Sequence, residues 1–419
     1  MRDKKIVVKI GSNILAKDSM SFIEWLAHSL KKIISVGYFP VIVTSGAIAA
    51  GKLSRGISKA TQSLSLNEKQ ALAAIGQPIL MSGYKEIFLK NDLEVAQVLI
   101  TRGDFMSRTR FSNIRSTLLA LIEYGVIPVI NENDTVATDE IKFGDNDELS
   151  AIVAAKIGAE KLILLTDVDG LYRGEFRKEN LVRVVEKITP DIKKLASKRN
   201  GAGTPPGGGI TRISEHGSGG MISKIRAAEI ATAAGIMTII TRPPDFKDKD
   251  FFVRAVSVKD GKDYALIDGT VFLPAPFYNN NEMTSGGLKA GVKGKTRRRG
   301  FDAKGCWIAF GAKPHGSIVV DRGAARAIAE GGKSLLASGV TAVEGEFSKG
   351  DVVSIKSILA SKNMSHLEEI GRGIVNYSSG ELSKIKGMRS TEIPRILHNN
   401  GATKEVIHRD NLVILKTLL

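Results

Sequence analysis

Short apolar runs alternate with stretches of helical periodicity as far as Ile240, and this alternation constrains the fold more than any other feature of the chain. The runs that read as strands are Ile6–Ile10, Val41–Val43, Val126–Ile130, Leu162–Leu165 and Met237–Ile240. Between the first two, apolar positions from Phe22 to Ile34 recur near the period of a helix, and Gly37 is placed to end it. Strands that alternate with helices predict an α/β domain with a largely parallel sheet.

After the last of these strands the chain changes character. A polar segment over residues 275–305 carries many lysines and arginines and reads as a basic linker. Beyond it, β-like runs at Ser317–Val320 and Val352–Ile355 flank a helical piece. Because 419 residues exceed what one hydrophobic core usually organises, we expect a first domain over residues 1–274 and a small, mostly β domain over residues 306–419.

Charge and targeting signals limit the class of protein. The chain carries 60 lysines and arginines against 44 acidic residues, and its formal charge of +16 favours anionic partners such as nucleotides, acidic metabolites or nucleic acid. No apolar stretch reaches the roughly 18 residues of a membrane span, and the N-terminus enters the first strand without a signal-peptide pattern. The single cysteine, Cys306, cannot form an internal disulfide, and no zinc site suggests itself. These features predict a cytoplasmic protein without a membrane partner.

One segment imitates a phosphate-binding loop. Gly46–Lys52 follows a strand and matches most of the pattern G-x-x-x-x-G-K-[ST], but Leu53 stands where the pattern requires a hydroxyl for magnesium. Ala47–Ala50 also favours the start of a helix over a loop whose amides surround phosphates. We therefore expect a helix here and no phosphate loop.

Two lysines occupy positions that suit phosphate binding. Lys9 lies in the first strand, just before Gly11, and ligands of open α/β sheets bind at the carboxyl ends of strands. Lys224 follows the glycine-rich segment Gly217–Ser223 at the start of an apparent helix, whose free amides and positive dipole end suit an anion. Taken singly, each has a structural alternative, an exposed edge strand for Lys9 and a flexible loop before Lys224.

Carboxylates and amides gather in two further segments. Asn131–Asp134 directly follows a strand, and Gly144–Asp147 precedes a helix. Capping of that helix accounts for an aspartate such as Asp147, but it explains Asn131–Asp134 less well. A site that holds an amino group with carboxylates and amides, beside lysines that hold phosphates, accounts for both segments. In addition, Leu164–Tyr172 ends a strand in a polar turn of the kind that seats a nucleotide base or ribose.

Six motifs occur in an order that resembles the motif series of the glutamate 5-kinases, in the amino-acid kinase family. They are Val8–Ser12, Val43–Ile48, Ile130–Asp134, Gly144–Asp147, Leu165–Asp167 and Gly219–Lys224. The resemblance extends from about Lys4 to Leu273 and resumes from about Trp307 to Leu415. In that second part, Gly316–Asp321 and Ala342–Phe347 are similar to a PUA domain of the RNA-binding type. The resemblance implies an αβα sandwich followed by a small, mostly β PUA-like domain.

The resemblance also implies a reaction, in which ATP with Mg²⁺ phosphorylates the γ-carboxylate of L-glutamate, the first step of proline biosynthesis. Carried over by motif, the catalytic residues are Lys9, Lys224 and Asp147, and glutamate is bound by Ser45, Asp134 and Asn146. ATP is bound by Lys9, Gly11, Thr166, Asp167, Ser218, Gly219, Gly220, Met221, Ile222, Ser223 and Lys224. The two lysines would neutralise the phosphates, and Asp147 would hold the two lysines in place. We also expect a homo-oligomer, γ-glutamyl phosphate reductase as a functional partner, and RNA as a further ligand of the PUA-like domain.

Departures and alternatives accompany this interpretation. Residues 198–215, 243–262 and 276–305 differ from the family pattern, while the catalytic positions are kept. Another kinase of the family, acting on acetylglutamate, carbamate or UMP, would share the glycines and lysines, although Asn131–Asp134 together with Gly144–Asp147 favours glutamate. An RNA-binding protein with an inert kinase-like domain is the alternative from a different class.

Overall fold

The computed structural model of the chain describes residues 4–17, 19–137, 146–197, 220–259, 263–274, 301, 303–361, 364–398 and 403–415. These residues divide into two compact units, one that runs to residue 274 and includes Phe301, and one that begins at Ala303. The predicted linker over 275–305 lies almost entirely outside the described residues. The expected domain boundaries beside it therefore stay predictions.

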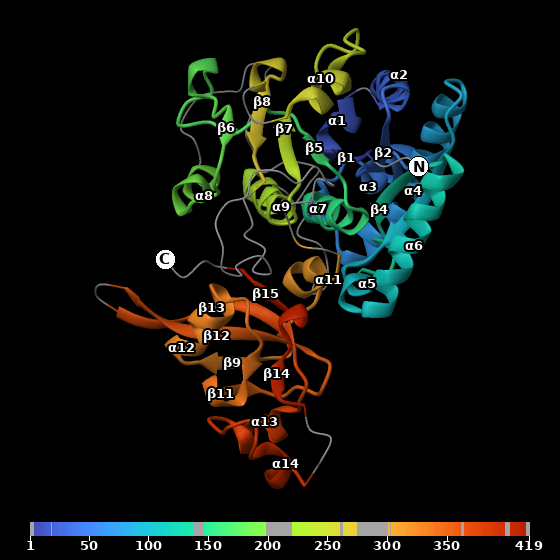
Figure 1. The fold of residues 1–419 in the computed structure, drawn as a ribbon. Helices are drawn as coiled ribbons and strands as arrows, with labels where there is room; N and C mark the ends of the chain where they lie inside the picture. The colour runs from blue at the N-terminus through green and yellow to red at the C-terminus, as the bar shows by residue number, and fades with distance from the viewer. Residues whose placement is uncertain are drawn as a thin grey trace. The chain divides into compact units, whose positions relative to one another are not determined.

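The first unit is built on an eight-stranded sheet with the order β3-β4-β2-β1-β5-β7-β8-β6 (Figure 1). Its strands are β1 (Lys4–Ile10), β2 (Tyr38–Val43), β3 (Val95–Ile100), β4 (Ile127–Glu132), β5 (Lys161–Leu165), β6 (Val184–Val185), β7 (Met237–Thr241) and β8 (Gly269–Phe272). Neighbours from β3 to β7 run parallel, whereas β8 is antiparallel to β7 and pairs in parallel with β6. The prediction of a mainly parallel sheet is confirmed.

The central strands are buried on both faces, which is why they read as unbroken apolar runs. Ile6, Val7 and Val8 of β1 have no exposed surface, and the same holds for Leu162 to Leu165 of β5. All five strands expected from the sequence are present, and their ends differ from expectation by at most three residues. The sequence interpretation missed β3, an edge strand whose apolar run is interrupted by Gln97 and is partly exposed.

Helices form the two outer layers of the predicted αβα sandwich. They are α1 (Ser12–Lys17), α2 (Ser19–Ser35), α3 (Ala47–Ser54), α4 (Leu66–Leu89), α5 (Arg102–Met106), α6 (Arg108–Tyr124), α7 (Asn146–Ile157), α8 (Pro190–Ser197), α9 (Met221–Ala233) and α10 (Phe251–Ser257). α6, α7, α9 and α8 pack in one row, and α3, α4, α2 and α10 pack in another. Two expectations are confirmed: α2 ends just before Gly37, which has φ 89°, and the segment that imitates a phosphate loop is the helix α3.

The helix α7 is buried on every side, whereas its sequence predicts only one apolar stripe. It contacts β1 and β5 as well as the helices α6 and α9. Even Ser150 and Lys156 are buried. The ammonium group of Lys156 lies 3.2 Å from the ring centroid of Phe111, where a cation–π contact partly replaces its lost hydration. The position of α7 is thus fixed by the layers around it.

The second unit has a hydrophobic core of its own. A five-stranded sheet has the order β11-β9-β12-β13-β15, and β10 pairs separately with β14. The strands are β9 (Gly316–Val320), β10 (Leu335–Leu336), β11 (Val340–Gly345), β12 (Val352–Ser361), β13 (Met364–Ile374), β14 (Glu405–Ile407) and β15 (Leu412–Ile414), and the helices are α11 (Ala303–Cys306), α12 (Arg322–Ala329), α13 (Ser379–Ile385) and α14 (Ile393–Ile396), with a π-helical turn at Trp307–Gly311. Ile318, Ile355 and Val406 are fully buried in the core. The expected mostly β architecture is confirmed.

Neither unit holds a candidate membrane span: among the described residues, no helix is both long and apolar enough to cross a bilayer.

Candidate active site

The predicted site residues converge at the carboxyl edge of the parallel strands. Lys9 of β1 is in register with Val43 of β2 and Leu164 of β5, so the segments that follow these strands lie side by side. Those segments hold Gly11, Ser45 and Thr166. Ligands of open α/β sheets bind at this edge. The first turns of α7 and α9 complete the site.

A single carboxylate joins the two predicted lysines. Asp147, in the first turn of α7, has no exposed surface, and its Oδ1 lies 2.6 Å from Lys9 Nζ. Its Oδ2 lies 3.1 Å from Lys224 Nζ and accepts a hydrogen bond of 2.8 Å from Ser223 Oγ. Burial alone would raise the pKa of this carboxyl, but the charges of Lys224 and Lys9 outweigh that effect and hold the pKa well below its ordinary value. Asp147 is therefore ionised throughout the physiological range.

The same carboxylate contacts both ammonium groups of the cluster. Both lysines are buried, with side-chain exposures of 3% for Lys9 and 8% for Lys224. Gly220 precedes α9 and has no side chain with which to cap it, and the first amides of that helix lie in the same turn as Lys224. Two buried ammonium groups beside a helix N-terminus favour an anion with several oxygens, such as a phosphate chain.

Amide groups line the neighbouring part of the site. Asn146 precedes Asp147, and its Nδ2 donates to the carbonyl oxygen of Thr44 at 2.7 Å and lies 3.0 Å from Ser45 Oγ. The same nitrogen lies 2.9 Å from Asn131 Oδ1, at the end of β4. The predicted residues Ser45 and Asn146 are thus brought together, although 101 positions separate them in the sequence.

Two further residues of this network were missed by the sequence interpretation. Gln77 of α4 accepts a 2.8 Å hydrogen bond from Asn131 Nδ2. Tyr84, also on α4, lies with its hydroxyl 3.0 Å from Thr44 Oγ1, and burial raises the pKa of that hydroxyl. A glutamine among the buried apolar positions of a helix is the one signal that could have identified Gln77.

The ends of β1 and β5 form the nucleotide side of the predicted site. Asn13 Nδ2 donates to Asp167 Oδ2 at 2.8 Å, and Thr166 Oγ1 donates to Asp167 Oδ1 at 3.1 Å. A Cβ on Gly11 would come within 3.2 Å of the Leu165 carbonyl oxygen, so glycine allows the chain to pass close to β5. Asp167 is exposed, whereas Thr166 is buried.

Of the remaining predicted site residues, the structure describes some and leaves others outside the described ranges. Asp134 lies in the turn after β4, half-buried. Met221 and Ile222 begin α9, and Ile222 is 58% exposed. Ser218 and Gly219 lie outside the described residues, as does the whole of the departing segment 198–215.

Fold and site together define a phosphotransferase of the amino acid kinase class, and comparisons with known proteins agree. The family model described as "Amino acid kinase family" matches residues 4–242, and the model described as "PUA domain" matches residues 316–397. A glutamate 5-kinase from a Nostoc species is 40% identical over 416 residues, covering 98% of this chain and 97% of that protein. A glutamate 5-kinase from Desulfotalea psychrophila is 40% identical over 421 residues, with the same coverage of 98% and 97%. The chain therefore belongs to the amino acid kinase family and, within it, to the glutamate 5-kinases.

A solved structure gives a weaker likeness. The carbamate kinase from Giardia lamblia bound to AMP-PNP aligns with 65% of this chain and 99% of its own, at 18% identity and a TM-score of 0.40. A likeness at this level carries no argument about activity.

Proposed function

We propose that this enzyme transfers the terminal phosphoryl group of ATP to the γ-carboxylate of L-glutamate, yielding γ-glutamyl phosphate and ADP, the first step of proline biosynthesis. The observation that carries the proposal is the Asp147 carboxylate, which holds Lys9 and Lys224 together in a buried site. The relatives' shared name, over nearly the whole length of the chain, supports the choice of glutamate.

The chemistry needs charge neutralisation more than proton transfer. A γ-carboxylate is already ionised at neutral pH, so its oxygen attacks the terminal phosphorus directly and the bond to the bridging oxygen of ADP breaks. Lys9 and Lys224 would stabilise the charge on the transferring phosphoryl group, while Asp147 keeps both ammonium groups in place. Because Asp147 is already paired twice, we assign it a positioning role and no role as a base.

Substrates divide between the two sides of the site. We assign Ser45, Asp134 and Asn146 to glutamate, on the side where amide groups gather. Thr166, Asp167 and the segment from Gly220 to Lys224 are assigned to ATP, on the side of β5 and α9. Ser218 and Gly219 stay predictions for the phosphates.

Mg²⁺ fits this site as a companion of ATP. Mg²⁺ usually takes one or two carboxylates and completes its oxygen ligands with phosphates and water. Both oxygens of Asp147 are engaged by lysines, and the described residues contain no group of three or more His, Cys, Asp or Glu able to hold a metal. We therefore propose that Mg²⁺ enters on the ATP phosphates, where it would neutralise part of their charge.

A substrate panel tests the reaction. The purified enzyme, with ATP and Mg²⁺, would be given glutamate, acetylglutamate, carbamate or UMP, and hydroxylamine would trap any acyl phosphate as a hydroxamate. We expect a hydroxamate with glutamate and ADP release only in its presence. ADP formation with UMP or carbamate instead would assign the chain to another activity of the family, and no turnover with any acceptor would indicate an inert kinase fold.

A homo-oligomer is a further part of the proposal. Along α4, the exposed positions Ala71, Ala74, Ile75, Pro78 and Ile79 carry no charge, and Ile75 and Ile79 are 40% and 46% exposed. An apolar row of this kind on a helix supports self-association. Light scattering should give a particle mass that is a multiple of the 45.0 kDa chain mass, and Ile79→Lys should lower the measured particle mass. A monomeric wild-type enzyme would contradict the proposed homo-oligomer.

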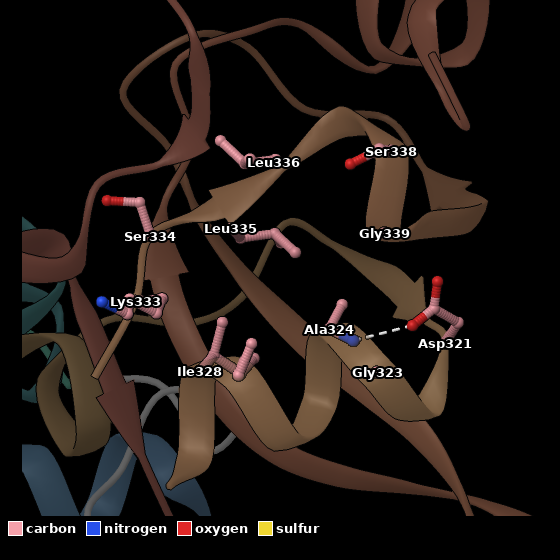
Figure 2. A pocket seen from close by; sticks show the side chains of 11 residues that line it. Asp321, Gly323, Ala324, Ile328, Lys333, Ser334, Leu335, Leu336, Ser338 and Gly339 are labelled. Carbon is pink, nitrogen blue, oxygen red and sulfur yellow. Dashed lines mark hydrogen bonds between the residues drawn. The ribbon is translucent and has the colours of Figure 1, made fainter. Parts of the chain in front are cut away.

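RNA binding is a second candidate function, which the match to the PUA domain over residues 316–397 supports, and a pocket in the second unit is its candidate site. The pocket has a volume of about 550 Å³ and is bounded by α12, β10 and the chain between them (Figure 2). Lys333 is its one basic lining residue, and Asp321 caps α12 through a 2.7 Å hydrogen bond from the Ala324 amide. RNA affinity should fall as the salt concentration rises. Lys333→Ala should lower the slope of log affinity against log salt concentration by about one, whereas substitution of the exposed Lys349 by alanine should leave that slope unchanged. Equal slopes for both variants would exclude this pocket as the RNA site.

Two expectations from the sequence stay predictions. A γ-glutamyl phosphate reductase is a suitable partner because acyl phosphates hydrolyse readily and must be consumed quickly. A cytoplasmic location follows only from the sequence.

A further inference from the structure

Three side-chain amides form a continuous chain from α4 into the acceptor side of the site. Gln77 Oε1 accepts from Asn131 Nδ2 at 2.8 Å, and Asn131 Oδ1 lies 2.9 Å from Asn146 Nδ2. The exposures of Gln77, Asn131 and Asn146 are 7%, 2% and 8%. Only Asn146 belongs to the residues assigned to substrate, so the other two must act through it or serve the fold alone.

Backbone groups fix the direction of every amide in this chain. The Glu132 backbone N–H donates to Asn131 Oδ1 at 2.9 Å, so the NH₂ group of Asn131 must face Gln77. Gln77 in turn must present its oxygen. At the other end, the Thr44 carbonyl accepts from Asn146 Nδ2, which orients that amide as well. The two backbone groups thus leave no freedom to exchange nitrogen and oxygen in any member.

The orientation of Asn146 determines what it can bind. Its nitrogen is directed at Thr44, Ser45 and Asn131, and among the described residues its Oδ1 has no hydrogen-bond donor. A carbonyl oxygen is an acceptor only. Glutamate carries two carboxylates, which also only accept, and one α-ammonium group, which donates. Asn146 Oδ1 therefore suits the ammonium group of the acceptor.

Gln77 is a costly residue for a purely structural role. Its Nε2 is buried and, within the described part of the chain, has no hydrogen-bond partner. Native cores rarely retain such a group. A methionine would fill the same volume without it, since the neighbouring buried positions Ala73, Leu80 and Tyr84 on α4 are mostly apolar.

We propose that Gln77 is a positioning residue for the acceptor amino acid: it holds Asn131, which holds Asn146 with its oxygen directed at the substrate's α-ammonium group. This inference rests on the proposed phosphorylation of glutamate. Gln77 acts on the acceptor through Asn131 and Asn146, so its loss should alter the affinity for glutamate and leave the phosphate chemistry of Lys9 and Lys224 unchanged.

The test is a kinetic comparison of Gln77→Met with the wild-type enzyme. We expect KM for glutamate to rise about tenfold, the effect of one weakened hydrogen bond to a charged group. KM for ATP and kcat should stay within about twofold, because the lysine cluster is intact. If Gln77→Met does not fold, Gln77→Asn serves instead. It keeps an amide but is one methylene too short to reach Asn131, and the same rise in KM is expected.

Two controls separate positioning from a structural effect. Asn91→Ala removes another buried amide, bonded to the Ile87 carbonyl at 2.9 Å just past the end of α4. It should lower the melting temperature without changing KM for glutamate. Glutarate, which lacks the ammonium group, is the second control. Its weaker hydroxamate formation should be equal in Gln77→Met and wild type. An equal loss with both acceptors would overturn the assignment to the ammonium group.

A double-mutant cycle tests the route through Asn131. If Gln77 acts through Asn131, then Gln77→Met should add no further rise in KM to Asn131→Ala. Independent, multiplying effects would overturn the proposed route. A wild-type enzyme that forms no glutamyl hydroxamate would instead contradict the proposed function itself. A wild-type enzyme that is active, with Gln77→Met showing an unchanged KM, would contradict only the role of Gln77.

Discussion

Asp147 places a full negative charge at a position with no exposed surface, and two lysines make this possible. Removing a carboxylate or an ammonium group from water is expensive, and the mutual attraction offsets that penalty only with close contacts and hydrogen bonds. Contacts of 2.6 and 3.1 Å, with the added hydrogen bond from Ser223, meet this requirement. A bound phosphate chain would bring further negative charge to these two ammonium groups.

Loss of either lysine should therefore impair the reaction. Lys9→Ala or Lys224→Ala is expected to reduce kcat at least about a hundredfold, the effect of removing one charge that stabilises a transition state. The rate of hydroxamate formation from glutamate measures this reduction in kcat. Lys193→Ala is the control, because Lys193 is half-exposed and pairs with Glu229 at 2.7 Å outside the site. Near-normal turnover in Lys9→Ala or Lys224→Ala would remove that residue from the mechanism.

Asp147→Asn should affect stability in a pH-dependent way. The variant removes the carboxylate that both buried ammonium groups contact, and a loss of about 3 kcal/mol in the free energy of unfolding is expected at pH 7. Because the folded-state pKa of Asp147 lies below its ordinary value of 3.8, its contribution is complete above that pH and is lost as pH falls further. The stability difference between wild type and variant, measured by urea unfolding, should shrink only below about pH 4. A difference that already shrinks near pH 6 would contradict this assignment.

At the level of elements, the contact between α3 and α4 positions the acceptor side of the site. A Cβ on Gly76 would lie 1.9 Å from the Ala47 carbonyl oxygen, and one on Gly51 would lie 2.0 Å from the Leu72 carbonyl oxygen. The two helices can approach this closely only because both positions are glycine. This approach sets Gln77, the next residue along α4, beside Asn131.

Two glycines of α4 should therefore respond in opposite directions. Gly76→Ala is expected to lower the free energy of unfolding by about 3 kcal/mol, because α3 must move away. Gly83→Ala is the matched control on the same helix, since a Cβ there meets nothing within 4 Å. It should stabilise the fold by up to about 1 kcal/mol through helix propensity. Urea unfolding of both variants provides the measurement, and equal effects would refute the close-contact account.

Elements differ in how well the sequence predicts them. Strands β1, β2, β4, β5 and β7 were predictable because burial on both faces demands continuous apolar runs. The edge strand β3 was not, since half of it faces solvent. For α7, the pattern gave the helix but not its burial, because Ser150 and Lys156 look like surface residues until the surrounding helices are in place.

At the scale of the whole molecule, the chain has two hydrophobic cores and one tryptophan in each unit. Trp25 lies on α2 in the first unit, and Trp307 lies in the π-helical turn of the second. The catalytic residues Lys9, Asp147 and Lys224 all belong to the first unit. Separate cores allow one unit to be weakened without direct change to the other's side chains.

A core substitution in the second unit tests this independence. Ile355→Ala removes a fully buried side chain from that core and should destabilise the second unit by about 2–5 kcal/mol. In a Trp25→Phe background, the fluorescence of Trp307 would report that unit alone. KM for glutamate and for ATP should stay unchanged. A parallel rise in either constant would show that the site depends on the second core.

The sequence by itself determined the α/β class, the family and the residue types of the site. Apolar periodicity and short motifs involve residues that are close in the sequence, so they can be recognised without the fold. It placed Lys9, Asp147 and Lys224 in separate motifs, with no means of measuring their separation. Only the tertiary structure decided that one carboxylate joins both lysines and that Gln77 reaches Asn131 across 54 positions. The physical reason is that hydrogen-bond direction and burial depend on which strands and helices lie side by side, and the order of the sheet sets that arrangement, not the order of the chain.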